Sequence, residues 1–346
     1  MSPLETGTLI HHVLENMLSR HEARTLRAIG RERLAAEVKE LLDGYLDERL
    51  GGSLEKTERF IYLYERLCTG LVRLLERLGD EFENCDFEPA AFELPVRENS
   101  SPVSSVRLMT PEGVEVVVEG FVDRVDVMEK DGRRYVRVVD YKSGGKVFRL
   151  SDVYYGLNLQ MLIYLFSISR NGKGKFADAI PAGVLYLPSD GAVIAAKRGD
   201  SDENITAERR KHYRMNGLIL NDIDSITGMD RSRSGVFIPA GFGKSGNLLR
   251  ADVSASLASL EELGKISGYI DELTVRMART LLDGDVAAVP VDNGLHSACE
   301  LCDYGEICRR DSASEVRSAV SFRTKQEFYA AIENEMKGDG EDAKMD

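Results

Sequence analysis

Two short β-rich segments carry the side chains most able to do chemistry. Residues 120–126 read GFVDRVD and residues 138–142 read VVDYK, with an Asp-Gly pair at 131–132 between them. An Asp-Gly pair between such segments predicts a β-hairpin turn. We expect the hairpin to bring Asp123, Asp140 and Lys142 to one edge of a sheet. Two carboxylates and an ammonium group are a minimal set for metal-dependent phosphodiester hydrolysis.

The two aspartates are suited to magnesium. Mg²⁺ prefers oxygen ligands and is commonly held by one or two carboxylates together with substrate phosphate. We expect Asp123 and Asp140 to supply the carboxylates and Lys142 to orient a water or stabilise developing charge. Burying two aspartates together without a cation is costly. The alternative is that Asp123 pairs with Arg124, Asp126 flanks a turn and Asp-x-Lys arises by chance; the combination favours a metal site.

A histidine near the N-terminus is a further candidate ligand. Residues 7–15 read GTLIHHVLE and have helical periodicity, so His11 and Glu15 share a helix face. A neutral imidazole can complete a divalent-metal site. A single helical histidine is more often a surface or core residue, and the glycine four positions earlier, Gly7, makes His11 a candidate.

Composition describes an ordinary globular chain. It has 346 residues, of which 43% are hydrophobic and 30% charged, enough for a substantial core. No apolar run approaches the roughly 20 residues of a membrane helix, and the N-terminus lacks the pattern of a signal peptide. We expect no membrane association and a cytoplasmic location.

The net charge restricts how nucleic acid could bind. The formal charge is −13, whereas binding to a polyanion depends largely on Lys and Arg at the phosphates. Any DNA contact must therefore be local or shared with a partner. The same charge supports an alternative of another class, a catalytically weak or inactive scaffold that keeps a nuclease fold and docks a helicase partner.

Periodicity predicts an α/β fold. Helices are expected at 5–20, 31–49, 55–80, 157–168 and 257–282, and an antiparallel meander between residues 87 and 141. A strand at 182–188 after the helix of residues 157–168 suggests a mixed sheet covered by helices. We expect one domain at 1–325, helical over 1–85, with a sheet core at 86–190 and a loop, helical and cysteine-containing part at 191–325. Residues 326–346 would form a C-terminal helix and a disordered acidic tail.

Three of the five cysteines are clustered. Cys299, Cys302 and Cys308 have the spacing Cys-x2-Cys-x5-Cys, which in a reducing compartment favours iron–sulfur or zinc over disulfides. Cys68 fits a small core residue on a helix and Cys85 a connecting segment. An iron–sulfur redox or sensor protein is therefore a third functional class.

Four motifs occur in an order that resembles RecB-type nucleases of the PD-(D/E)XK superfamily. They are GxxxHxxLE at 7–15, GxxDRxD at 120–126, DYKSG at 140–144 and Gln160-x3-Tyr164. The resemblance implies a restriction-endonuclease-like mixed central sheet flanked by helices, with added helical segments. It also implies that His11, Asp123 and Asp140 bind Mg²⁺ or Mn²⁺ with the Tyr141 carbonyl, and that Lys142 is the catalytic lysine. Gln160 and Tyr164 would support the site or the DNA backbone.

Within that superfamily, residues 181–186 and the cysteine cluster resemble the nuclease domains of the AddB family of helicase–deoxyribonuclease proteins. This implies an exonuclease that degrades a single DNA strand, unwound with an AddA-like partner, in double-strand break processing and recombinational repair. It also implies a [4Fe-4S] cluster on Cys299, Cys302 and Cys308. The fourth cysteine of that pattern precedes the helix of residues 7–15 and has no counterpart in this sequence.

Overall fold

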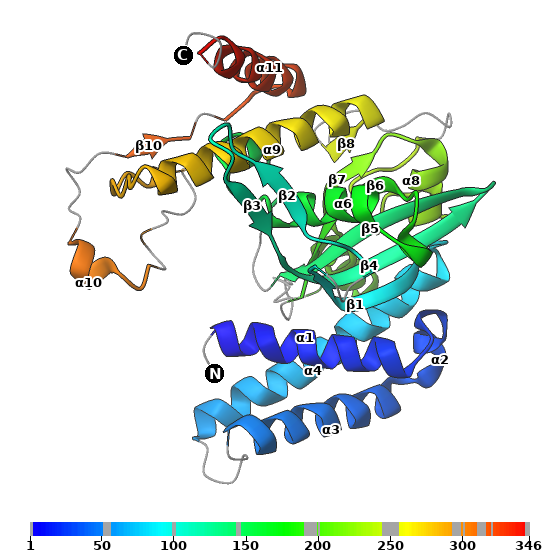
Figure 1. Ribbon diagram of the computed structural model, residues 1–346. Coiled ribbons are helices and arrows are strands. Elements are labelled where there is room, and N and C mark those ends of the chain that lie inside the picture. The colour runs from blue at the N-terminus through cyan, green and yellow to red at the C-terminus, as the bar shows by residue number, and fades with distance from the viewer. Residues whose placement is uncertain are drawn as a thin grey trace.

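A mixed six-stranded sheet lies at the centre of the molecule, in the order β1-β4-β5-β6-β7-β8 (Figure 1). The computed structural model describes residues 3–50, 57–98, 102–142, 147–189, 199, 201–243, 256–292, 299, 302–309, 316–319 and 321–342. The strands are β1 (Glu88–Val96), β2 (Val106–Met109), β3 (Glu115–Val118), β4 (Gly120–Lys130), β5 (Arg133–Lys142), β6 (Ile180–Pro188), β7 (Asn216–Leu220), β8 (Leu257–Ala258), β9 (Val291–Asp292) and β10 (Arg317–Ser318).

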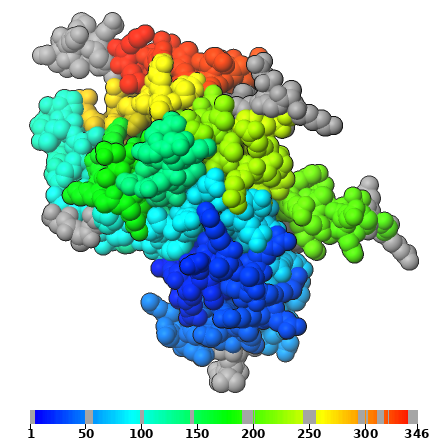
Figure 2. All heavy atoms as spheres, turned by 90° about the vertical axis from the view of Figure 1, so that its right-hand side faces the viewer, coloured from blue at the N-terminus to red at the C-terminus, as the bar shows by residue number. Residues whose placement is uncertain are grey.

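Helices surround this sheet and form a separate lobe at the N-terminal end (Figures 1 and 2). The α-helices are α1 (Pro3–Arg20), α2 (Leu26–Ile29), α3 (Arg31–Leu50), α4 (Glu58–Glu83), α5 (Leu150–Tyr154), α6 (Gln160–Asn171), α7 (Asp202–His212), α8 (Ile223–Met229), α9 (Leu260–Leu282), α10 (Gly305–Cys308) and α11 (Lys325–Asp342). The mixed α/β architecture confirms the predicted fold class.

The N-terminal lobe consists of amphipathic helices packed on one another. Helix α4 starts at Thr57, whose side chain accepts a hydrogen bond from the Phe60 N–H and so satisfies one of the helix's first amide groups. Its C-terminal half is buried through Leu74, Leu78 and Phe82. Since this half also packs against the sheet, α4 joins the helical lobe to the strands that carry the site.

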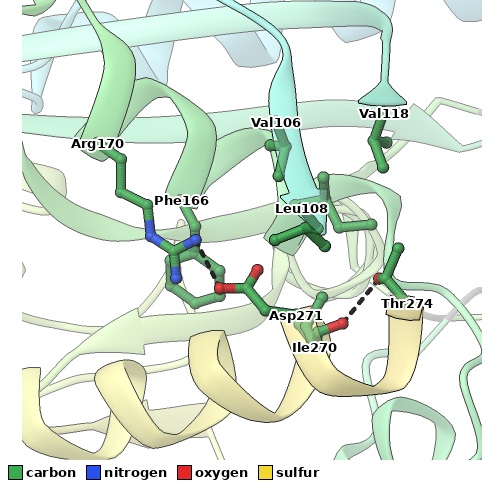
Figure 3. A pocket seen from close by; sticks show the side chains of 9 residues that line it. Val106, Leu108, Val118, Phe166, Arg170, Ile270, Asp271 and Thr274 are labelled. Atoms are coloured by element: carbon green, nitrogen blue, oxygen red, sulfur yellow. Dashed lines mark hydrogen bonds and ion pairs between the residues drawn. The ribbon is translucent and has the colours of Figure 1, made fainter. Parts of the chain in front are cut away.

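The strand order differs from the expected meander. Strand β1 pairs antiparallel with β4, whereas β2 and β3 form a separate two-stranded hairpin. The simple meander was wrong because the hairpin leaves the sheet and packs against α6 and α9 (Figure 3). The cavity beneath it is about 10 Å³, room for no more than one water. Arg170 and Asp271 form an ion pair of 2.7 Å there.

The crossover from β5 to β6 confirms the predicted strand, helix and strand. Strands β5 and β6 pair in parallel, and α6 packs against both. A parallel pair needs such a crossover connection. Strand β7 lies in a part of the chain expected to hold only loops and short helices, and its apolar residues Leu218 and Ile219 are fully buried beside β6.

Alternation along β4 and β5 sends neighbouring residues of the GxxDRxD motif to opposite faces of the sheet. Asp123 faces the predicted metal site, while Arg124 and Asp126 face α4. Both nitrogens Nε and Nη2 of Arg124 donate to Asp126 at 2.8 Å. Arg137 donates from Nε to Asp126 at 2.8 Å and from Nη2 to Glu81 of α4 at 2.6 Å. Arg124 therefore pairs with Asp126 rather than with Asp123.

This buried ionic cluster of Arg124, Asp126, Arg137 and Glu81 ties the sheet to α4. The first three side chains are fully buried and Glu81 nearly so. Burial acts to raise the pKa of Asp126, but the two guanidinium groups outweigh burial and lower it. The second aspartate of the motif is thus a structural anchor beneath the site.

The C-terminal helices pack over α5 (Figure 1). Helix α9 begins with a capping box in which Ser259 and Glu262 bond reciprocally to each other's backbone N–H. Helix α11 continues to Asp342, so residues 338–342, expected to be disordered, are helical, and residues 343–346 lie outside the described part. No helix in the described ranges is long and apolar enough to span a membrane.

Candidate metal centre

The hairpin places Asp123 and Asp140 opposite each other on adjacent strands. Val139 of β5 pairs with Arg124 of β4, so the next residues in each direction, Asp140 and Asp123, face one another on the same side of the sheet. An Asp123 carboxylate oxygen also accepts a hydrogen bond from the Tyr141 N–H at 3.3 Å. The two aspartates thus meet as their spacing from the Asp-Gly turn predicts.

Helix α1 brings His11 against the same carboxylate. His11 Nδ1 lies 3.5 Å from Asp123 Oδ2, and His11 Nε2 lies 3.1 Å from the Tyr141 carbonyl oxygen. Because a carbonyl oxygen can only accept, Nε2 carries the proton and Nδ1 faces the carboxylates. This second contact fixes the orientation of the ring, as partners of ligating histidines commonly do. The Tyr141 carbonyl, expected as a metal ligand, here holds the histidine.

Glu93 of β1 completes the group and was missed from the sequence. Its Oε1 lies 3.8 Å from His11 Nδ1, and the ligand atoms of His11, Glu93 and Asp123 all lie within 4.8 Å of one another. Among the described residues, no other set of three histidine, cysteine or acidic side chains is gathered this closely. Glu93 also has φ +42°, uncommon for a residue other than glycine.

Crowded negative charge changes the titration of the site. Burial and the charge of Asp140 raise the pKa of Asp123 from 3.8 to about 7. Burial acts to lower the pKa of His11, but the hydrogen bond with Glu93 and the charge of Asp123 outweigh it and raise the pKa above 6.5. The site therefore has more negative charge than its own cationic groups stabilise.

Lys142 lies beside the second aspartate. Its Nζ is 2.8 Å from Asp140 Oδ2. Asp140 and Lys142 have the same parity along β5 and so project from the same face. The ammonium group reaches the edge of the acidic cluster, where it can contact a reacting group held next to Asp140.

Gln160 and Tyr164 flank the site from α6. Gln160 Nε2 donates to Tyr164 Oη at 3.2 Å, which confirms that the two share a helix face. A Cβ atom at Gly120 would lie 1.8 Å from Tyr164 Oη. Only glycine leaves room for this tyrosine, which explains the glycine three residues before Asp123 in the motif.

The C-terminal cysteines are not gathered into a ligand group in the described structure. Cys299, Cys302 and Cys308 are exposed, and their sulfur atoms form no set of ligands within 4.8 Å of one another among the described residues. Cys85 is fully buried, and burial raises the pKa of its thiol to about 12. Cys68 is half-buried on α4. The cysteines present here do not fit a four-cysteine cluster.

The acidic group, by contrast, fits a divalent cation. One imidazole nitrogen and two carboxylates converge, with Asp140 beside them. Oxygen-rich sets with one imidazole suit Mg²⁺ or Mn²⁺. The raised pKa of Asp123 reports unbalanced charge that a bound cation would offset.

Metal affinity should depend on pH near neutrality. Metal binding requires Asp123 and His11 to lose their protons, and both pKa values are raised. We expect the Kd for Mn²⁺, measured by calorimetry, to increase about tenfold for each pH unit below about 7. Asp140→Asn, which removes the neighbouring charge, should move this transition to lower pH. A Kd that is constant between pH 6 and 8 would contradict the assignment of these ligands.

Comparison with known proteins identifies relatives over nearly the whole chain. A family model described as the PD-(D/E)XK nuclease superfamily matches residues 1–309. A protein of Clostridium acetobutylicum, named as the B-type subunit of an ATP-dependent helicase/deoxyribonuclease, is 32% identical over 99% of this chain. A protein of the same name from Caldanaerobacter subterraneus is 30% identical over 98%. The chain spans 30% and 29% of the lengths of these two relatives.

Proposed function

Because the chain belongs to the PD-(D/E)XK nuclease superfamily, we propose that it is a Mg²⁺-dependent deoxyribonuclease domain that hydrolyses phosphodiester bonds of single-stranded DNA as an exonuclease. The observation that carries the proposal is the convergence of His11, Glu93 and Asp123, next to Asp140 and Lys142, at one sheet edge. These are the side chains that metal-assisted phosphodiester hydrolysis requires.

Each residue has a separate role in the proposed site. His11, Glu93, Asp123 and Asp140 would hold the cation, with the Tyr141 carbonyl orienting His11 or joining the ligands. A bound cation supplies Lewis acidity and makes water more acidic. Lys142, held by Asp140 at 2.8 Å, would orient the attacking water or stabilise charge on the phosphate.

Tyr164 and Gln160 form the wall of the proposed site beside Gly120. Tyr164 is buried and its hydroxyl accepts from Gln160. We propose that this pair keeps β4 at a fixed distance from α6 and presents the exposed end of Gln160 to the DNA backbone. The domain of residues 1–325 would work as one unit with α11 packed on it.

The relatives support a setting for this activity. Proteins named as B-type subunits of ATP-dependent helicase/deoxyribonucleases match the chain over almost all its length. We propose that the domain acts with an AddA-like helicase partner, in the cytoplasm, on a strand released by unwinding during double-strand break processing and recombinational repair. An iron–sulfur cluster would need ligands beyond the cysteines of this chain, and no step of the proposal uses one.

Cleavage by the chain itself tests the proposal. An end-labelled single-stranded oligonucleotide should be degraded with Mg²⁺ or Mn²⁺ and remain intact with EDTA. Release of mononucleotides or short products from an end would identify an exonuclease. A folded protein that binds Mn²⁺ but leaves the labelled DNA uncut under these conditions would overturn the proposal.

The net charge of −13 favours one competing function, a nuclease-fold scaffold that docks a helicase partner. The two functions differ in what the metal ligands do. A scaffold would bind the partner equally well after Glu93→Gln and would show no metal-dependent cleavage with or without the partner. A nuclease would lose cleavage on this substitution while partner binding stayed unchanged.

A further inference from the structure

An exposed aromatic ring lies on the same face of the sheet as the metal-binding carboxylates. Phe121 pairs with Pro95, and the neighbouring pair is Leu94 with Val122. Leu94 and Val122 are buried, whereas Phe121 is 43% exposed. Because side chains alternate along a strand, Phe121 shares its face with Asp123.

The ring is close to the site and has a fixed orientation. Two residues of β-strand separate Phe121 from Asp123, which corresponds to about 6.6 Å along the strand. The Arg97 guanidinium lies over the Phe121 ring, with its central carbon 4.4 Å from the ring centroid. Arg97 follows Pro95 on the same face of β1 and is itself exposed. Phe121 and Arg97 thus form a stacked pair directly beyond the acidic group.

The charge of the protein makes such a pair useful. A net charge of −13 supplies no general attraction for a polyanion. Binding of a single strand must then rely on local contacts, and stacking of bases on aromatic rings and guanidinium planes is the sequence-tolerant contact that proteins use for this purpose. A cation in the pair adds complementarity to the adjacent phosphate.

We propose that Phe121 and Arg97 form a stacking subsite for the nucleobase next to the scissile phosphate of single-stranded DNA. This inference rests on the proposed nuclease function and names a positioning element for it. A base held against the ring would fix the strand relative to His11, Glu93 and Asp123. Duplex DNA, whose bases are already stacked on each other, could not use the subsite.

The test uses short single-stranded oligonucleotides with 2-aminopurine at successive positions, bound to the full chain in Ca²⁺. Stacking on Phe121 should alter 2-aminopurine fluorescence at one position. Phe121→Leu keeps an apolar side chain but removes the ring, and we expect about tenfold weaker binding and loss of the fluorescence change. Phe121→Trp should retain both.

Controls separate stacking from a general loss of structure. Tyr62→Leu removes another exposed aromatic residue, 60% exposed on α4, and should leave DNA binding unchanged. All variants should keep the wild-type Kd for Mn²⁺, since none removes a ligand. Arg97→Gln leaves the ring but not its guanidinium partner, and we expect roughly two- to fivefold weaker binding.

Binding by Phe121→Leu within about twofold of wild type, with the same fluorescence change, would overturn the subsite. So would equal losses in Phe121→Leu and Tyr62→Leu. Cleavage in Mg²⁺ is measured separately. If wild type fails to cut the oligonucleotide yet its binding depends on Phe121, the nuclease proposal fails while the stacking subsite stands.

Discussion

Asp123→Asn is expected to abolish divalent-metal binding and lower DNA cleavage by about 1,000-fold, while making the metal-free protein more stable above neutral pH. The first effect follows because the amide is a poor metal ligand, and the cation contributes several kcal/mol of charge stabilisation in the transition state. The amide oxygen can still accept the Tyr141 N–H that Asp123 accepts at 3.3 Å. The fold should therefore persist.

The stability effect has a defined direction. The pKa of Asp123 is raised from 3.8 to about 7 in the folded protein, so folding favours its protonated form. That stabilisation is complete below pH 3.8 and is lost as pH rises to about 7. Asparagine never ionises, so the variant should gain on wild type across this range. About three pH units at about 1.4 kcal/mol each give at most about 4 kcal/mol.

Denaturation with urea in EDTA at several pH values measures this difference, and calorimetry with Mn²⁺ measures the ligand loss. Asp131→Asn at the tip of the same hairpin is the matched control. Asp131 is exposed and has φ +50°, a conformation that asparagine tolerates. Equal metal affinity in Asp123→Asn and wild type would exclude Asp123 as a ligand.

Asp126→Ala should destabilise the protein by about 3–5 kcal/mol without removing a metal ligand. Asp126 accepts hydrogen bonds from both Arg124 and Arg137, and all three side chains are fully buried. Removing it leaves two buried guanidinium groups without their main partner. Folded molecules should keep the wild-type Kd for Mn²⁺, since Asp126 faces away from Asp123.

Asp224→Ala is the contrasting variant. Asp224 also pairs with two cations, Lys130 at 2.7 Å and Arg133 at 2.9 Å, but these groups are partly exposed. Exposed pairs contribute about 0–1 kcal/mol. Urea denaturation of both variants compares a buried and an exposed aspartate with the same number of partners. A loss below about 1 kcal/mol for Asp126→Ala would show that the buried cluster does not anchor the sheet.

The sequence by itself determined the features that depend on local spacing. The Asp-Gly turn and the two-residue period of the strands were enough to place Asp123 opposite Asp140, with Lys142 on the same face. The helical period likewise placed Gln160 and Tyr164 together. These relations hold because the partners belong to one hairpin or one helix, whose backbone geometry is nearly fixed.

Only the tertiary structure decided the rest of the candidate site. Glu93 reaches Asp123 because β1 pairs with β4 after the β2–β3 hairpin leaves the sheet. His11 contacts the Tyr141 carbonyl across 130 residues of sequence, through the packing of α1 on the sheet. The division of labour between Asp123 and Asp126 depends on which sheet face α4 covers. Such long-range contacts follow from the packing of whole elements, which no local period in the sequence specifies.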